Sequence, residues 1–281
     1  LESPTIEGFN KIVSRDDYID NLKNIIENKC FSKIHRDGTL SRNQVNSIRA
    51  SQIICVNLER IADFCVNIAR QMEYLSDPAF IKRYDYKAML ETISQSLGQV
   101  LPVANTMDLA GALSICRSEF DLDRQYKTSF DHIMAELRTG LHVEALITVL
   151  FIFRYLERVG DSLLNIGEAL IFAIIGEKIK IEQFQALQQT LNKTGYKGPI
   201  TDIDFQSIWG TRSGCRIGKV SQKEEDADAA HGSIFKEGAL KKIRREKENI
   251  ESWNNIFPGL APKVFSYHEE DDNASLLVED R

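Results

Sequence analysis

The stretch NLERIADFCVNIA at residues 57–69 recurs with few changes as YLERVGDSLLNIG at residues 155–167. Glu59 in the first stretch aligns with Glu157 in the second. In both stretches apolar residues return every three or four positions, which is the period of a helix that buries one face. A repeat of this kind indicates two related helical units in one chain, each packing its apolar stripe inside a helix bundle.

A second pair of matching segments supports the duplication. The segment DDYIDNL begins at Asp16, and the segment EFDLDRQ begins at Glu119. These two segments lie slightly farther apart in the sequence than the two stretches that contain the letters LER, which we call the LER stretches. We therefore expect a longer connection between the helices of the first copy, around residues 35–38. The two pairs together predict related helical units that follow one another along the chain.

Pairs of carboxylates four positions apart occur in all four segments. Such pairs lie on one helical face, about 5–6 Å apart, and repel each other by a few tenths of a kcal/mol. In the LER stretches the pair lies one row beside the apolar stripe, in a row that Asn67 and Asn165 extend. Carboxylates there would be partly desolvated and costly without a cation. Two such helices packed together would form an oxygen-rich patch suited to a hard divalent cation or iron. The candidate metal ligands are Asp16, Asp20, Glu59, Asp63, Glu119, Asp123, Glu157 and Asp161.

A simpler interpretation of each acidic pair is solvated surface. A single ExxxD pair on a helix is a weak signal, and Arg60 or Arg158 could neutralise its neighbours in an ordinary ion pair. The repetition of the pairs at matching positions beside an apolar stripe favours metal ligands over this alternative.

The phrases LERIADFCVNIA and LERVGDSLLNIG, with their acidic pairs, resemble the hallmark of the PhoU family of phosphate-uptake regulators over roughly residues 9–190. The resemblance implies two three-helix bundles that bind multinuclear metal clusters, commonly of iron, through these carboxylates. It also implies a cytoplasmic protein, at most peripheral to the membrane, that restrains a phosphate ABC transporter and its partner sensor kinase. A homodimer is left open.

The first copy departs from this pattern. The second copy has a helical run at about residues 86–104 before EFDLD, opened by Asp85 and stalling near Pro102, and the next helix has Asp108 as its candidate N-cap. The first copy has no room for an equivalent run before Asp16. We therefore expect an incomplete first repeat at residues 1–80, with a weaker case for metal there, and a complete second repeat at residues 85–193.

The chain changes character after residue 193. Glycines and a proline at residues 195–199 predict a linker. The strands are expected at residues 203–208, 216–220, 233–236, 263–267 and 275–278, with a helix at about 239–254 and a solvated acidic loop at 223–228. The sequence therefore predicts a mainly α chain that ends in a small α+β unit at residues 200–281.

The order of elements in this last unit resembles the N-lobe of the aminoglycoside phosphotransferase and choline kinase superfamily. The resemblance implies that Lys236 on the third strand holds nucleotide phosphate and that Glu246 on the helix is its ion-pair partner. It also implies that Gly210, Gly214 and Gly218 in the first turn approach the phosphates. ATP and Mg²⁺ would be the cofactors only if such a domain were complete.

Three departures limit the kinase interpretation. The glycine spacing is not GxGxxG, the interval from Lys236 to Glu246 is short, and the chain ends before any HxD-type catalytic loop. A glycine hairpin, a surface lysine and a charged helix would be the ordinary alternative. We therefore assign no catalytic residue to this chain and expect no catalysis from it alone.

Composition excludes several other classes. The net charge of −6 argues against a nucleic-acid binder. The five cysteines are scattered without a CxxC pair, which argues against a disulfide framework and fits a reducing cytosol, and the five histidines have no metal-binding spacing. The most apolar stretch, at residues 146–153, is too short to span a membrane.

Two functions follow from the sequence. The first is a metal-binding regulator of phosphate uptake and signalling that acts through protein–protein contacts. The alternative is a phosphotransferase with a PhoU-like sensor domain, of which this chain is a fragment, since neither Leu1 nor Arg281 looks like a natural terminus.

Overall fold

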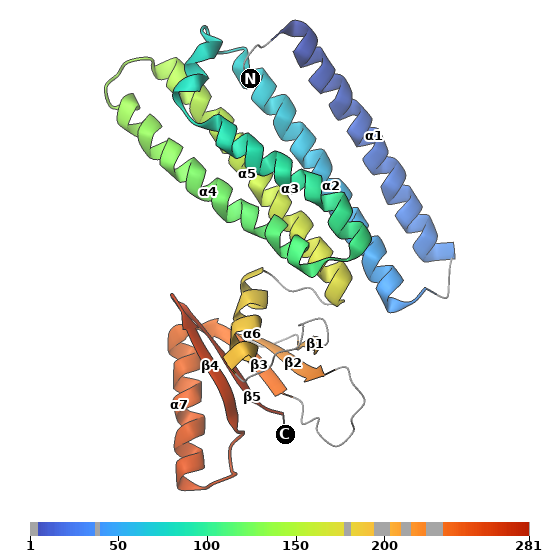
Figure 1. Cartoon of the computed structure of the whole chain (residues 1–281), viewed down its shortest axis with the longest axis vertical. Coiled ribbons are helices and arrows are strands. Elements are labelled where there is room, and N and C mark those ends of the chain that lie inside the picture. The colour runs from blue at the N-terminus through green and yellow to red at the C-terminus, as the bar shows by residue number, and fades with distance from the viewer. Residues whose placement is uncertain are drawn as a thin grey trace. The chain divides into compact units, whose positions relative to one another are not determined.

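The structure is a computed structural model that describes residues 5–36, 40–176, 181–193, 203–208, 215–222 and 233–280. The chain forms two compact units, Leu1–Gly176 and Glu177–Arg281, each with its own core. The first unit is helical, and the second is built on a sheet (Figure 1). None of the helices in the described residues is both long and apolar enough to cross a membrane.

The first unit consists of a two-helix hairpin packed against a three-helix bundle (Figure 1). The first two helices form the hairpin, the last three form the bundle, and α2 packs against α5. The described elements of this unit are α1 Ile6–Arg36, α2 Arg42–Met72, the short 3₁₀ helix η1 Pro78–Arg83, α3 Tyr86–Thr106, α4 Leu109–Leu137 and α5 Val143–Ile175.

Side-chain caps fix where these helices begin. The Ser41 hydroxyl accepts from the backbone N–H of Gln44, whose side chain in turn accepts from the Ser41 N–H, so α2 begins with a capping box. The Asp85 carboxylate accepts from the backbone N–H of Ala88 at the start of α3, and the Asp108 carboxylate accepts from that of Ala110 at the start of α4, as the sequence predicts. These caps satisfy backbone donors that have no partner inside the helix.

Helix α3 continues through Pro102 to Thr106, whereas the sequence led us to expect that it stalls near the proline. A proline inside a helix removes one hydrogen bond to the carbonyl four residues earlier. That carbonyl belongs to Gly98, which is exposed, so water can take the place of the missing donor. The cost of the proline is therefore small enough for one more helical turn to form.

The two LER helices, α2 and α5, run antiparallel through the middle of the unit. The Asn165 amide donates a hydrogen bond of 3.2 Å to the Asn57 side-chain oxygen at the centre of this contact. At the end of α5, the Asn46 amide donates to the carbonyl of Gly176, whose φ of +89° favours glycine. The repeats are therefore joined through the helices that carry the duplicated phrase.

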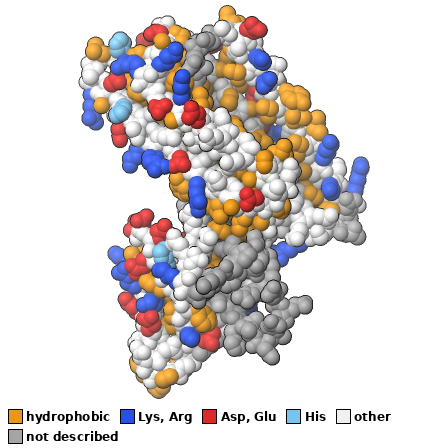
Figure 2. Space-filling view, in the orientation of Figure 1, with side chains coloured by type: hydrophobic (Ala, Val, Ile, Leu, Met, Phe, Trp, Pro, Cys, Tyr) orange, Lys and Arg blue, Asp and Glu red, His pale blue; other side chains and the backbone are white. Residues whose placement is uncertain are grey.

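Helix α1 buries only Cys30, although it is 31 residues long. In the second repeat α3 packs against both α4 and α5, but no helix in the described part of the chain covers α1 in the same way. Figure 2 shows hydrophobic side chains gathered on the side of the unit where α1 and α2 lie. The exposed apolar side chains of α1 include Ile6, Tyr18, Ile25 and Phe31.

The second unit is a five-stranded antiparallel sheet of order β1-β2-β3-β5-β4, with helices on both faces. The described elements are α6 Ile181–Lys193, β1 Ile203–Ile208, β2 Arg216–Gln222, β3 Ser233–Ala239, α7 Leu240–Ile256, β4 Val264–Glu270 and β5 Asn273–Glu279. The expected strands and helix are all present, each with ends within a few residues of the prediction. The predicted linker at 195–199 and the acidic loop at 223–228 lie outside the described residues.

Helix α6 packs on the sheet, whereas the sequence led us to place residues 181–193 with the second helical repeat. Its Thr190 hydroxyl lies 2.7 Å from the hydroxyl of Ser275 in β5. The neighbouring residue Leu276 faces the other way, into a core with Ile243 of α7. Alternation along β5 thus places α6 and α7 on opposite faces of the sheet. Helical periodicity shows that α6 buries one face, but not which partner covers it.

Candidate metal centres

The second acidic cluster lies between α4 and α5, which a short connection joins as an antiparallel pair. A Cβ atom at Gly160 would lie only 3.6 Å from the Glu119 Cα, so the two helices approach closely at this level. The segments EFDLD and LERVGD therefore lie beside each other, as the sequence predicts. This close approach brings Glu119 and Asp123 of α4 to the level of Glu157 and Asp161 of α5.

Glu157 is the buried member of this cluster, with 8% of its surface exposed. Burial raises the pKa of Glu157, and the charges of Asp161 and Asp123 raise it further, while Arg154 lowers it. Arg154 donates to the Glu157 Oε1 atom at 2.7 Å. The other oxygen, Oε2, is buried and has no hydrogen-bond partner among the described residues. Glu157 is therefore only half satisfied by the protein itself.

Asp161 and Asp123 complete the outer side of the cluster. Asp161 accepts an ion pair of 2.9 Å from Arg158, which is the simple neutralisation considered above. Asp123 is exposed and lines, with Glu157, a pocket of about 590 Å³ on the surface of α4 and α5. The cluster is therefore open to ions from solvent on one side and closed by the helix contact on the other.

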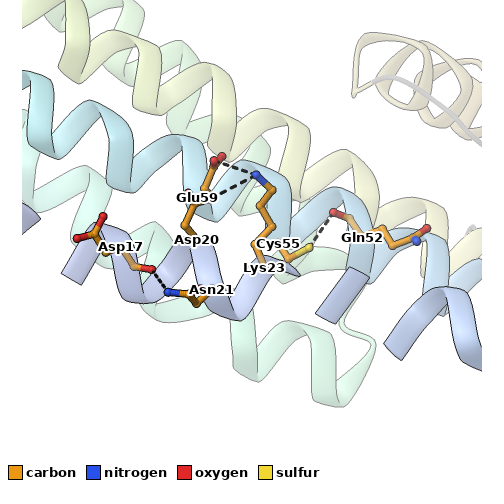
Figure 3. Close-up of polar contacts among 7 residues, drawn as sticks. All are labelled: Asp17, Asp20, Asn21, Lys23, Gln52, Cys55 and Glu59. Atoms are coloured by element: carbon orange, nitrogen blue, oxygen red, sulfur yellow. Dashed lines mark hydrogen bonds and ion pairs between the residues drawn. The ribbon is translucent and has the colours of Figure 1, made fainter. Parts of the chain in front are cut away.

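The first acidic cluster lies between α1 and α2. Burial raises the pKa of Asp16, and the charges of Asp63, Asp20 and Glu59 add to that effect, so the four predicted residues do lie near one another. The ammonium of Lys23 lies among them, 2.9 Å from the Glu59 Oε1 atom and 3.5 Å from the Asp20 Oδ1 atom (Figure 3). The hydrogen bond to Glu59 raises the pKa of Lys23.

The acidic residues thus form two clusters, one within each repeat. The charges that act on Glu157 come from α4 and α5, and those that act on Asp16 come from α1 and α2. Asn165, which extends the acidic row of α5, donates its amide to Asn57 between the two repeats. Within the described ranges, no three Asp, Glu, His or Cys side chains are gathered closely enough to hold a metal ion as they stand.

Sequence reasoning missed the cations that contact the two LER glutamates. In the repeat alignment, Lys23 of the first copy matches Tyr126 of the second, and Val56 of the first matches Arg154 of the second. Each copy therefore has one cation for its glutamate, but the cation comes from a different helix in each. The alignment contains this signal, although only the helix packing shows that both cations reach the equivalent glutamate.

In the second unit Lys236 of β3 forms an ion pair with Glu246 of α7. The pairing register places Lys236 opposite Leu276, on the face of the sheet that α7 covers. Gly218 lies inside β2 opposite Phe235, not in the first turn as we expected, so its backbone is engaged in the sheet. Gly210 and Gly214 lie outside the described residues.

The two helical repeats are joined through their LER helices, and each repeat contains an acidic cluster. These features define a protein of the duplicated helical-bundle class. The model of the PhoU domain matches residues 1–72 and 86–170, so the match includes the acidic segments of both repeats. The chain therefore belongs to the PhoU family.

Similar proteins agree with this assignment. A relative from Clostridium acetobutylicum, described as a phosphate-specific transport system accessory protein PhoU homolog, is 28% identical over 177 residues, which cover 60% of this chain and 78% of the relative. A relative with the same description from Caulobacter vibrioides is 28% identical over 174 residues, covering 60% of this chain and 74% of its own.

Two crystal structures share the helical fold. PhoU from Pseudomonas aeruginosa superposes with a TM-score of 0.54 at 21% identity, covering 60% of this chain and 82% of that protein. The phosphate transport system regulatory protein PhoU from Streptococcus pneumoniae gives a TM-score of 0.55 at 20% identity, covering 62% and 82%.

Proposed function

We propose that this protein is a regulator of phosphate transport that acts through protein–protein contacts. The observation that supports the proposal is the family match across both acidic repeats, together with relatives that are described as accessory proteins of phosphate-specific transport. Its partners would be a phosphate ABC transporter and the associated sensor kinase. The place of action would be the cytoplasmic side of the membrane, and a homodimer stays among the alternatives.

Deletion of the gene tests this function. We expect the deletion strain to express its phosphate-starvation genes and to take up phosphate strongly even in high-phosphate medium, because the restraint on the transporter is lost. A plasmid copy of the full chain should restore the low uptake. Unchanged uptake and unchanged reporter expression in the deletion strain would contradict the proposal.

The finer part of the proposal is that the second repeat binds metal through Glu119, Asp123, Glu157 and Asp161. The unpaired and buried Oε2 atom of Glu157 supports this, since such an atom is costly unless a donor or a cation satisfies it. The ligand set consists of carboxylate oxygens, which suits iron or a hard divalent ion. A bound cation would neutralise the repulsion in the cluster and stabilise the α4–α5 contact.

Metal content and thermal stability test this part. We expect the purified protein to contain metal by elemental analysis and to melt at a lower temperature after treatment with a chelator. Asp161→Asn should lower the metal content, while the metal-free variant melts no lower than the metal-free wild type. The proposal would be contradicted if the protein contained no metal and its melting temperature did not change with added iron, zinc, manganese or magnesium. The carboxylates would then be ordinary solvated surface residues.

A second candidate function is suggested by the ion pair between Lys236 and Glu246. This pair joins the third strand to the following helix, which is where a phosphotransferase N-lobe places its phosphate-binding lysine and its partner. The glycine spacing departs from GxGxxG, and the interval from Lys236 to Glu246 is short for such an N-lobe. We therefore expect no measurable Mg-ATP binding by calorimetry. Micromolar binding that disappears in Lys236→Ala would make the enzyme the leading candidate.

A further inference from the structure

We propose that the ammonium of Lys23 takes the place of a metal ion in the first repeat, so that metal binding is confined to the second repeat. The inference rests on the proposed metal site between α4 and α5. Both repeats have the same four carboxylate positions, but among the described residues Glu157 of the second cluster keeps a buried oxygen without a hydrogen bond, whereas Glu59 at the matching position of the first cluster is paired with Lys23.

Lys23 lies within the first acidic cluster. Its ammonium lies between the carboxylates of two different helices, Asp20 on α1 and Glu59 on α2 (Figure 3). The pair is partly withdrawn from solvent, with 23% of the Lys23 side chain and 16% of the Glu59 side chain exposed. An ammonium at the centre of an acidic cluster occupies the region where a cation would find its ligands.

The second repeat provides the comparison. There Tyr126 stands at the position of Lys23, and the cations come from α5 itself: Arg154 pairs with Glu157, and Arg158 pairs with Asp161. The Arg154 guanidinium lies over the Tyr126 ring, 5.7 Å from its centroid, and contacts only one oxygen of Glu157. The other oxygen is buried and has no hydrogen bond among the residues described. Arg154 therefore neutralises the glutamate from its side and leaves an oxygen available to a metal ion.

Electrostatics explains why an ammonium and a metal ion exclude each other. Two positive charges about 4 Å apart repel strongly at the effective dielectric constant of a protein surface. A metal ion could bind to Asp20 and Glu59 only after Lys23 had moved away and its ion pairs were lost. Because the lysine is part of the chain, its local concentration is fixed and high. Free metal would have to compete with it continuously.

The experiment separates the two clusters by mutation. We would load each protein with Mn²⁺, remove free metal, and measure bound manganese by elemental analysis. In Glu157→Gln/Asp161→Asn, where only the first cluster keeps all its carboxylates, we expect almost no bound manganese. Adding Lys23→Gln to that variant should restore binding, with a gain of roughly a hundredfold or more in affinity. Lys29→Gln, at an exposed position on the same helix, is the matched control and should restore none.

Melting temperature provides a readout that does not depend on metal stoichiometry. Without metal, Lys23→Gln should melt a few degrees below the wild type, because it leaves two carboxylates unpaired. Added Mn²⁺ should raise its melting temperature more than it raises that of the wild type. Circular dichroism checks that the helices are intact. Lys23→Tyr, which installs the residue found in the second repeat, is the second variant and should behave in the same way.

Two outcomes would overturn the proposal. One is manganese retained at the first cluster of Glu157→Gln/Asp161→Asn while Lys23 is present. The other is no gain of metal when Lys23 is replaced by either residue in a folded protein. If the wild type binds no metal at all, the proposed function of the second repeat fails. The role of Lys23 is then still decided by whether Lys23→Gln alone gains a manganese site.

Discussion

At the scale of single residues, Gly167 shows how closely α4 and α5 pack. A Cβ atom there would lie 2.4 Å from the Cys116 sulfur and 3.0 Å from both the Ala112 carbonyl oxygen and the Cys116 nitrogen. The sulfur can rotate away, but the backbone atoms can move only if the helices separate. We expect Gly167→Ala to lower the free energy of unfolding by about 1–3 kcal/mol in urea denaturation.

Gly98 provides the control for this prediction. It lies inside α3, and a Cβ atom there would meet nothing within 4 Å. Gly98→Ala should therefore raise stability by about 0.5–1 kcal/mol through helix propensity alone. If both substitutions stabilised the protein, this result would contradict the close packing of α4 and α5 at Gly167.

The raised pKa of Glu157 predicts how the metal-free protein responds to pH. Its folded-state pKa lies above the usual value of 4.5, chiefly because of burial, so the folded state binds the proton more tightly than the unfolded chain. Stability contributed by this group is present below pH 4.5 and is lost as the pH rises through the raised pKa. Each unit of raised pKa is worth about 1.4 kcal/mol.

Glu157→Gln should therefore flatten the decline of stability with rising pH in this window. The measurement is urea denaturation of the chelator-treated protein at a series of pH values from 4 upward. Glu91→Gln, at an exposed position on α3, is the control and should keep the wild-type slope. An unchanged slope in Glu157→Gln would show that burial does not raise this pKa.

Sequence reasoning at this scale found the carboxylates but missed their counterions. The carboxylates repeat at matching positions, so a comparison of the chain with itself is enough to find them. Lys23 and Arg154 do not match each other, and only helix packing shows that they reach equivalent glutamates. The partner of Asn165 was missed for the same reason, because it depends on the register of α2 against α5.

At the scale of elements, α1 is the least anchored helix of the first unit. It buries one residue, Cys30, whereas α5 buries residues along most of its length. Local opening is easiest where few apolar contacts are lost. We expect the amides of α1 to exchange with deuterium much faster than those of α5, when peptides from residues 9–30 and 146–172 are followed by mass spectrometry. Equal protection of the two helices would contradict this expectation.

The elements that were predicted well are those whose evidence is local. Caps at Asp85 and Asp108 and alternation along the strands lie within a few neighbouring residues, and they placed helices and strands correctly. Helix α3 ends at Thr106, two residues beyond its expected end, because the cost of Pro102 depends on whether water reaches a carbonyl. We placed α6 with the helical bundle, but it packs on the sheet. An amphipathic pattern shows that a helix buries one face, but it does not show which element covers that face.

At the scale of the whole molecule, the two units have separate cores, and every candidate metal ligand lies in the first. Domains with their own cores commonly unfold as separate cooperative units. We expect differential scanning calorimetry to resolve two transitions, of which only one moves to higher temperature when Mn²⁺ is added. A single transition that shifts as a whole would show that the units unfold together.

The ion pairs of Lys23 with Asp20 and Glu59 have a consequence for the shape of the metal response. A duplicated protein with two working sites can respond to its ligand cooperatively, over a narrow range of concentration. If Lys23 keeps metal out of the first cluster, as proposed, coupling between the repeats has no second binding event to act on. Metal binding to one chain would then follow a hyperbolic curve, with no cooperativity between the two repeats. The response would be graded over a wide range of metal concentration, although the fold contains two copies of the same hairpin.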